Sequence, residues 1–271
     1  MTTTGALQPQ SASETAAGAA LTIQGNVAEI AFRNGPLNLV DGPMLRALRA
    51  AIIEVSANAE IRCVIVHGGD ARAFCAGSDI RGLPGLRHDA SEQKILFEDL
   101  VLRQLARLPM PTIAAIDGPA LGGGLELALA CDLRVLRRGV RIGMPESRLG
   151  GLAGNGTVRL TRLVGPARAK QMLFTGEMLA DDQALAWGLV NEVTDEGNAL
   201  DRARLLAATI ALRGPVSNRL AKELVEAALD LHLDAALSMS TAAQQKIFDS
   251  DDLQEGVKAF LSKREPGFAG R

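Results

Sequence analysis

Short apolar runs separated by turn residues fill the first part of the chain, and longer segments with helical spacing fill the last part. Residues 21–32 alternate loosely between apolar and polar side chains around Gly25-Asn26, which predicts a β-hairpin. Residues 61–67 form a nearly continuous β-branched run, typical of a strand buried on both faces. Further strands are predicted over 112–116, 133–136 and 189–193.

Helical periodicity predicts amphipathic helices between and after these strands. The predicted helices cover residues 45–55, 91–108, 168–174, 180–188, 203–212, 216–231, 241–248 and 252–263. The pattern predicts an α/β fold in which strand–strand–helix units give way to a helical region near residue 200. We therefore divide the chain into a disordered leader (1–18), a core (19–200) and a C-terminal helical region (201–271).

Composition excludes several classes of function. The chain has 29 basic and 31 acidic side chains, so no positive excess is available to neutralise a nucleic-acid backbone. One Trp and no Tyr leave little surface for stacking bases. No apolar run is long enough to span a membrane. The leader contains no Lys or Arg, which argues against a signal or transit peptide.

Cysteine usage favours a cytoplasmic protein. Cys63, Cys75 and Cys131 are odd in number and scattered through apolar stretches, which is typical of buried, reduced thiols. Cys63 and His67 would share a strand face, but a pair without further ligands is not a zinc site. We expect no metal.

The most informative stretch is Gly122-Gly123-Gly124 followed by Glu126. Glycine lets a ligand approach the backbone closely, and the first amides of a helix lack internal partners and point outward. Glu126 would lie in the first turn, beside whatever these amides bind. The run can equally be a tight helix–strand connection, and dipole preference alone explains a glutamate there.

A second small-residue turn, Ala76-Gly77, and a second carboxylate, Glu146, extend this pattern. Amides aimed at a thioester oxygen would stabilise the enolate formed when a proton leaves or joins the α-carbon. A pair of carboxylates could position a water and move a proton, and burial would raise their pKa values toward working pH. Each glutamate taken alone is explained as well by an ordinary structural role.

Several separated motifs, in order, resemble the enoyl-CoA hydratase/isomerase (crotonase) superfamily from about Leu21 to the C-terminus. The matching segments are Phe74-Cys75-Ala76-Gly77-Ser78-Asp79, Gly118-Pro119-Ala120-Leu121-Gly122-Gly123-Gly124-Leu125-Glu126, Arg141-Ile142-Gly143-Met144-Pro145-Glu146, Leu160-Thr161-Arg162-Leu163-Val164-Gly165, Thr175-Gly176-Glu177, Gly188-Leu189-Val190 and Ala259-Phe260-Leu261-Ser262-Lys263-Arg264. Two positions depart from the family pattern: Ala153 stands where proline is usual, and Asn155 where a small residue is usual.

The resemblance implies a spiral of strand–strand–helix turns whose C-terminal helices build homotrimers, often paired into hexamers. It implies an oxyanion hole from the amides of Ala76 and Gly123, with Glu146 exchanging the α-proton and Glu126 activating the water. Gly154 matches the glycine whose amide helps to hold that water. The remaining substrate-binding residues that we expect from the motifs are Gly77, Ser78, Asp79, Ile80, Gly122 and Pro145.

Retention of both glutamates favours a hydratase that adds water across the trans-2 double bond of an acyl-CoA thioester. Coenzyme A is then part of the substrate, and no separate cofactor is expected. The main alternative is an enoyl-CoA isomerase, which needs one glutamate; decarboxylation, dehalogenation and thioester hydrolysis on the same scaffold rank below it. A non-catalytic acyl-CoA- or RNA-binding relative is the alternative outside the enzymes.

Overall fold

The computed structural model describes residues 18–195 and 197–271. The predicted leader lies outside the described residues except for Gly18, with which the first strand begins. Within the described ranges, none of the helices combines the length and hydropathy needed to cross a membrane.

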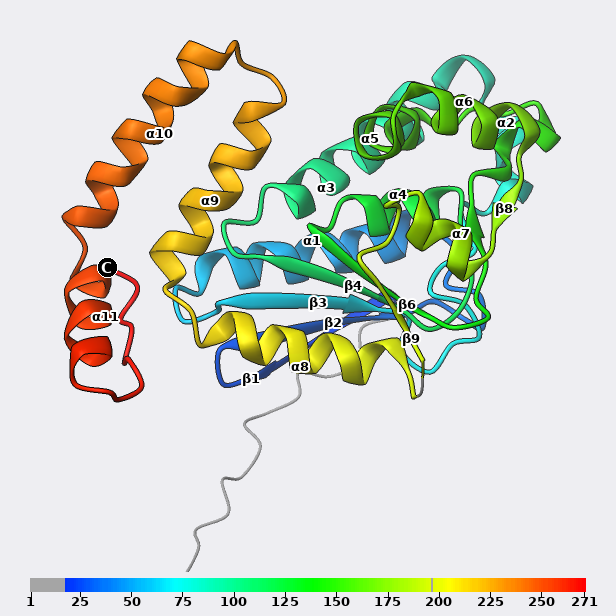
Figure 1. Cartoon of the computed structure of the whole chain (residues 1–271). Helices are drawn as coiled ribbons and strands as arrows, with labels where there is room; N and C mark the ends of the chain where they lie inside the picture. The colour runs from blue at the N-terminus through cyan, green and yellow to red at the C-terminus, as the bar shows by residue number, and fades with distance from the viewer. Residues whose placement is uncertain (1–17, 196) are drawn as a thin grey trace, which may run out of the picture.

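A six-stranded sheet forms the centre of the molecule, in the order β1-β2-β3-β4-β6-β9 (Figure 1). β1 and β2 form the predicted antiparallel hairpin, and every later neighbour in this sheet is parallel. Every residue of β3 and β4 is buried, as their β-branched and small apolar sequences lead one to expect. The strands are β1 (Gly18–Gln24), β2 (Val27–Arg33), β3 (Cys63–His67), β4 (Thr112–Ile116), β6 (Leu133–Arg137) and β9 (Glu192–Thr194).

Helices cover both faces of this sheet (Figure 1). The main core lies between one face and helices α1 (Gly42–Ala57), α3 (Leu96–Ala106) and α4 (Gly123–Leu129). Helix α8 (Ala199–Ala211) packs on the other face, where Ala199, Ala203 and Ala207 meet the side chains of β3 and β4.

A second, three-stranded sheet holds the loops that surround the candidate site. It consists of β5 (Ala120–Leu121), β7 (Ile142–Gly143) and β8 (Met178–Leu179). Around it lie the 3-10 helix η4 (Pro145–Leu149) and helices α5 (Gly154–Val164), α6 (Pro166–Thr175) and α7 (Asp181–Ala186).

The remaining helices, α9 (Pro215–Ala228), α10 (Leu233–Phe248) and α11 (Asp251–Leu261), extend away from the sheet (Figure 1). Lys222 of α9 reaches back to Asp132 at 2.7 Å, and both side chains are largely buried. These helices leave a set of large apolar side chains exposed: Val225, Leu229, Leu233, Leu237, Phe248, Val257, Phe260 and Leu261.

Most predicted elements are present, but several differ in extent. The helix predicted over 241–248 begins at Leu233, and the strand predicted over 189–193 is β9 at Glu192–Thr194. The predicted helix over 91–108 begins as a π-helix, η3 (Ser91–Ile95), before it continues as α3. A chain of short turns precedes it: η1 (Ile80–Gly82), α2 (Leu83–Leu86) and η2 (Arg87–Asp89). Helix α5 begins at Gly154, and two glycines in its first turn, Gly154 and Gly156, hide its helical periodicity in the sequence.

One buried side chain, that of Asn38, holds the loop before α1 to the rest of the core. Its amide nitrogen donates to the carbonyl oxygens of Gly68, Ala73 and Phe74 at 2.8, 3.1 and 3.1 Å. Its side-chain oxygen accepts from the amide of Asn34 at 2.9 Å. Asn38 also adopts φ 48°, which asparagine tolerates better than most residues.

Asn38→Ala is therefore expected to lower the free energy of unfolding by about 2–4 kcal/mol, because several buried backbone groups lose their partner. Urea unfolding measures the change. Asn58→Ala is the matched control, since that side chain makes an exposed hydrogen bond to the amide of Glu60; it should cost about 0.5 kcal/mol or less. Equal losses in the two variants would contradict this role for Asn38.

Candidate active site

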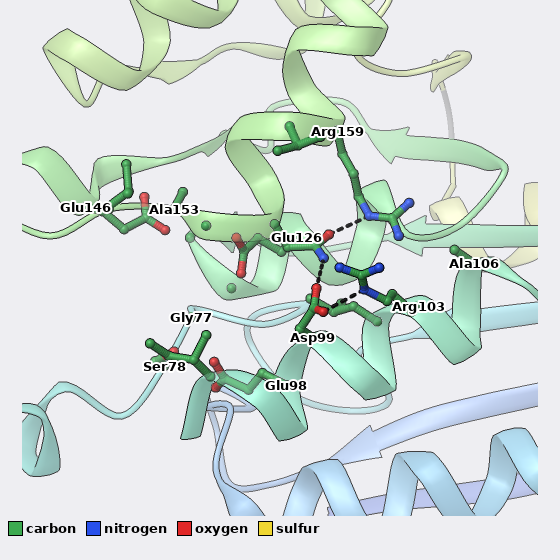
Figure 2. Close-up of a pocket in the computed structure, with 18 of the residues that line it drawn as sticks. Gly77, Ser78, Glu98, Asp99, Arg103, Ala106, Glu126, Glu146, Ala153 and Arg159 are labelled. Atoms are coloured by element: carbon green, nitrogen blue, oxygen red, sulfur yellow. Dashed lines mark hydrogen bonds and ion pairs between the residues drawn. The ribbon is translucent and has the colours of Figure 1, made fainter. Parts of the chain in front are cut away.

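A cavity of about 1530 Å³ lies between the N-terminal end of α4, helices α3 and α5, η4, and helix α9. It collects ten of the eleven residues that the sequence singled out, and Figure 2 shows several of them around one open space. Those ten are Ala76, Gly77, Ser78, Ile80, Gly122, Gly123, Glu126, Pro145, Glu146 and Gly154.

Asp79 is the exception. Its carboxylate forms an ion pair with Arg81 at 2.5 Å and caps η1 through the amide of Arg81. It faces a smaller hollow beside the main cavity, which Asn34, Pro36 and Asp41 also line. The structure therefore places Asp79 in this smaller hollow and not in the main cavity.

Glycine is required where the two motif loops meet. A Cβ on Gly124 would lie 1.9 Å from the carbonyl oxygen of Cys75, so any side chain there would push the two backbones apart. Gly122 has φ 53°, and a Cβ on it would lie 2.7 Å from Oε1 of Glu146. The amide of Leu121 completes the contact by donating to Cys75 at 3.0 Å.

The structure corrects one predicted oxyanion donor. The amide of Ala76 donates to the carbonyl oxygen of Leu37 at 2.9 Å, so the prediction that Ala76 supplies a free N–H is wrong. Two residues later, the amide of Ser78 has no acceptor within the described residues, and neither has that of Gly123. A Cβ on Gly123 would lie 3.8 Å from the Ser78 nitrogen, so the two free amides are neighbours.

This correction has a simple origin. Val40 and Ser78 form a parallel β-bridge, so the loop around Ser78 is locally extended. In an extended backbone, successive N–H groups point in opposite directions. Because the Ala76 amide turns toward Leu37, an inward-facing donor has to come from another residue of the loop. The sequence motif identified the loop correctly but could not show this alternation.

Glu126 lies in the first turn of α4, as predicted, with its carboxylate in the cavity. Its Oε1 accepts from the amide of Gly156 at 2.6 Å. Burial raises the pKa of Glu126, the Gly156 hydrogen bond lowers it, and the negative charge of Glu146 raises it further. Gly154 lines the cavity from the start of α5, but the amide that reaches Glu126 is that of Gly156, which we had not predicted.

Glu146 enters the cavity from η4, directly after Pro145 at the start of that helix. Its Oε2 is buried and has no hydrogen-bond partner within the described residues. Burial raises the pKa of Glu146. An unpartnered buried carboxylate oxygen is costly unless a ligand or water meets it, so this atom marks where a ligand would bind.

A group of charged side chains on η3, α3 and α5 also lines the cavity, and these residues were not predicted from the sequence. Lys94 and Glu98 form an ion pair at the start of α3, and Lys94 also donates to Oγ of Ser78 at 3.1 Å. One turn further, Asp99 accepts from Asn155 at 2.8 Å and from Arg103 at 2.6 Å, as dashed lines in Figure 2 show. In the sequence, the only indication of this group is that its charged residues recur at helical spacing, which places them on one side of a helix.

The geometry also predicts a pH-dependent stability. Burial holds the pKa of Glu126 above its usual value of 4.5, so its ionisation opposes folding. The penalty is absent below the unfolded-state pKa and grows as pH rises through the folded-state pKa. Glu126→Gln should therefore raise the melting temperature by a few degrees at pH 8 and change it little at pH 4.

Differential scanning fluorimetry across this pH range measures the effect. Glu54→Gln, on the exposed side of α1, is the matched control and should show no such pH-dependent gain. A Glu126→Gln variant that is less stable than the parent at pH 8 would contradict the assignment of Glu126 as a destabilised, buried carboxylate.

Comparison with known proteins agrees with the geometry. The profile of the enoyl-CoA hydratase/isomerase family matches residues 22–271. The chain is 34% identical to a short-chain-enoyl-CoA hydratase of Clostridium acetobutylicum, over 92% of this chain and 96% of that protein. It is 36% identical to an enoyl-CoA isomerase/hydratase of Mycosarcoma maydis, over 84% of each.

The fold gives the same result. A crystal structure of an enoyl-CoA hydratase from Bacillus anthracis superposes with a TM-score of 0.90 at 32% identity, covering 94% of this chain and 100% of that one. The matches extend over the core and the C-terminal helices alike, and they include the loops that build the cavity. This chain belongs to the enoyl-CoA hydratase/isomerase family.

Proposed function

We propose that this protein is an enoyl-CoA hydratase, which adds water to the trans-2 double bond of an acyl-CoA thioester. The observation that carries the proposal is the arrangement of two partly buried carboxylates, Glu126 and Glu146, around a cavity that also holds two free amides. Figure 2 shows both carboxylates directed into the same space. An isomerase needs one proton-transferring carboxylate, whereas addition of water uses two.

In the proposed reaction, the thioester oxygen accepts hydrogen bonds from the amides of Ser78 and Gly123, which stabilise its negative charge as the enolate forms. Ionised Glu126 takes a proton from water while the water oxygen bonds to the β-carbon. Protonated Glu146 then delivers its proton to the α-carbon, and the carbonyl is restored. Water is consumed, and the product is a 3-hydroxyacyl-CoA.

The electrostatics favour this division of roles. Burial raises the pKa of both glutamates, and the negative charge of Glu146 raises that of Glu126 further, so the pair retains a proton more readily than exposed glutamates would. The Gly156 amide stabilises the ionised form of Glu126, whereas Oε2 of Glu146 has no donor in the described residues. Glu126 is therefore the better base, and Glu146 the better acid. Because all proton transfers are assigned to protein side chains, the proposal uses no cofactor besides the coenzyme A of the substrate.

Two further expectations belong to this proposal. The apolar side chains exposed on α9, α10 and α11 support assembly into homotrimers or hexamers through the C-terminal helices. Three buried, unpaired cysteines support residence in a reducing compartment such as the cytoplasm.

Glu126→Gln and Glu146→Gln are each expected to lower kcat for crotonyl-CoA hydration about a hundredfold or more, because each removes one proton-transfer group. Loss of absorbance of the conjugated thioester follows the reaction. Unchanged hydration in either variant would contradict the proposed roles.

Exchange of the α-proton with deuterium separates the alternatives. In the parent protein, exchange together with hydration supports a hydratase, and exchange without hydration supports the isomerase. Glu126→Gln should retain exchange better than Glu146→Gln does. Thermal stabilisation by CoA esters with neither reaction would identify a non-catalytic binder and refute the proposal.

A further inference from the structure

Lys94 and Glu98 form an ion pair at helical spacing, and this pair is not on the outer surface of the protein. It lies within the wall of the cavity, and only 22% and 19% of the two side chains are exposed. Exposed pairs at this helical spacing contribute little stability, and partial burial adds a desolvation cost. In a cavity that accepts an acyl group, two apolar side chains would be the less costly choice. The pair therefore calls for a functional explanation.

Its contacts provide one. The Lys94 ammonium group bridges Glu98 and the hydroxyl of Ser78, whose backbone carries one of the two free amides. The lysine belongs to the π-helical turn η3, at the point where the chain passes from the short turns over residues 80–89 into α3. Local π-helical turns of this kind are frequent at functional sites because they redirect a side chain.

The same pair faces Glu126. Figure 2 shows Glu98 and Ser78 across the open space from Glu126. Glu98 raises the pKa of Glu126 and Lys94 lowers it, so the two effects oppose each other. The other charged group that acts on this carboxylate is Glu146 from η4. Further along the cavity, Arg103 and Asp99 pair with each other, and Arg159 of α5 lies beside Asn155 and near Glu226 of α9.

We propose that Lys94 and Glu98 act together as positioning residues: Lys94 fixes the oxyanion loop through Ser78, and the pair presents a neutral surface to Glu126. A lysine alone would add a positive charge beside the base and weaken it. A glutamate alone would leave a third carboxylate in the cavity. Only the combination ties the loop in place without changing the charge that Glu126 experiences.

This inference rests on the proposed hydratase function, and its test compares pH profiles of kcat/KM for crotonyl-CoA. Lys94→Met leaves Glu98 unopposed, so the acidic limb should move to higher pH by about half a unit or more. Glu98→Gln leaves Lys94 unopposed and should move the limb to lower pH. The double variant should return it close to the parent position.

Two further variants separate the charge effect from the loop contact. Ser78→Ala removes the hydroxyl but keeps the backbone amide; it should lower kcat several-fold and leave the acidic limb in place. Arg202→Met is the matched control, because it breaks a partly exposed ion pair with Glu192 that does not line the cavity. It should leave both kcat and the limb close to the parent values.

Single variants that move the acidic limb in the same direction, or not at all, would overturn the inference. An equal shift from Arg202→Met would also overturn it. A measurement without turnover keeps the test independent of the proposed function. The pH-dependent gain in melting temperature caused by Glu126→Gln reports the pKa of Glu126 directly through linkage. Repeating it in the Lys94→Met and Glu98→Gln backgrounds should give shifts of opposite sign, even if the protein does not hydrate crotonyl-CoA.

Discussion

The contact between the backbone at Cys75 and the start of helix α4 is the constraint on which the site depends. No atom beyond Cα fits at Gly124, where a Cβ would lie 1.9 Å from the Cys75 carbonyl oxygen. This closeness brings the amides of Ser78 and Gly123 to one point and places Glu126 one turn behind them. The β5 hydrogen bond from Leu121 to Cys75 and the cluster of bonds around Asn38 keep the two loops from separating. The oxyanion site is therefore a property of backbone packing, and the surrounding side chains serve to hold that packing.

The two carboxylates of the site, Glu126 and Glu146, lie in positions that lower the stability of the folded protein. Glu126 is partly buried with one hydrogen bond from a backbone amide, and Glu146 has a buried oxygen without a donor in the described residues. A protein selected for stability alone would not retain either arrangement. Their raised pKa values and their poor hydrogen bonding have the same cause, namely removal from water. The same burial that costs stability raises the pKa of both carboxyl groups above the usual value for glutamate, which favours proton transfer to and from a substrate.

Periodicity was sufficient for the fold because the elements of the sheet have simple patterns. The β-branched run that became β3 and the alternation that became β1 and β2 were predicted correctly, and the family and its α/β fold are confirmed by the comparisons. The site was predicted less completely. Motifs identified both glutamates and Gly123, but the choice of Ser78 over Ala76 depends on which way each N–H points. Gly156 reaches the site because α5 packs against α4, and Lys94 reaches it because η3 lies beside Ser78. Spacing along the chain does not show either contact. The catalytic roles of these residues, and the division of the chain at residue 200, stay predictions.

Helix α9 forms one wall of the cavity, and this limits where the chain can be truncated without opening the site. Lys222 lines the cavity and also forms an ion pair with Asp132. One wall of the cavity therefore comes from a helix beyond residue 200. A boundary drawn from the change in secondary-structure pattern near residue 200 therefore separates two regions that line one cavity. A fragment ending near residue 200 would keep both glutamates and both amides, yet its cavity would be open to solvent where α9 is missing. A fragment of this protein can therefore contain the whole sheet and still lack a complete active site.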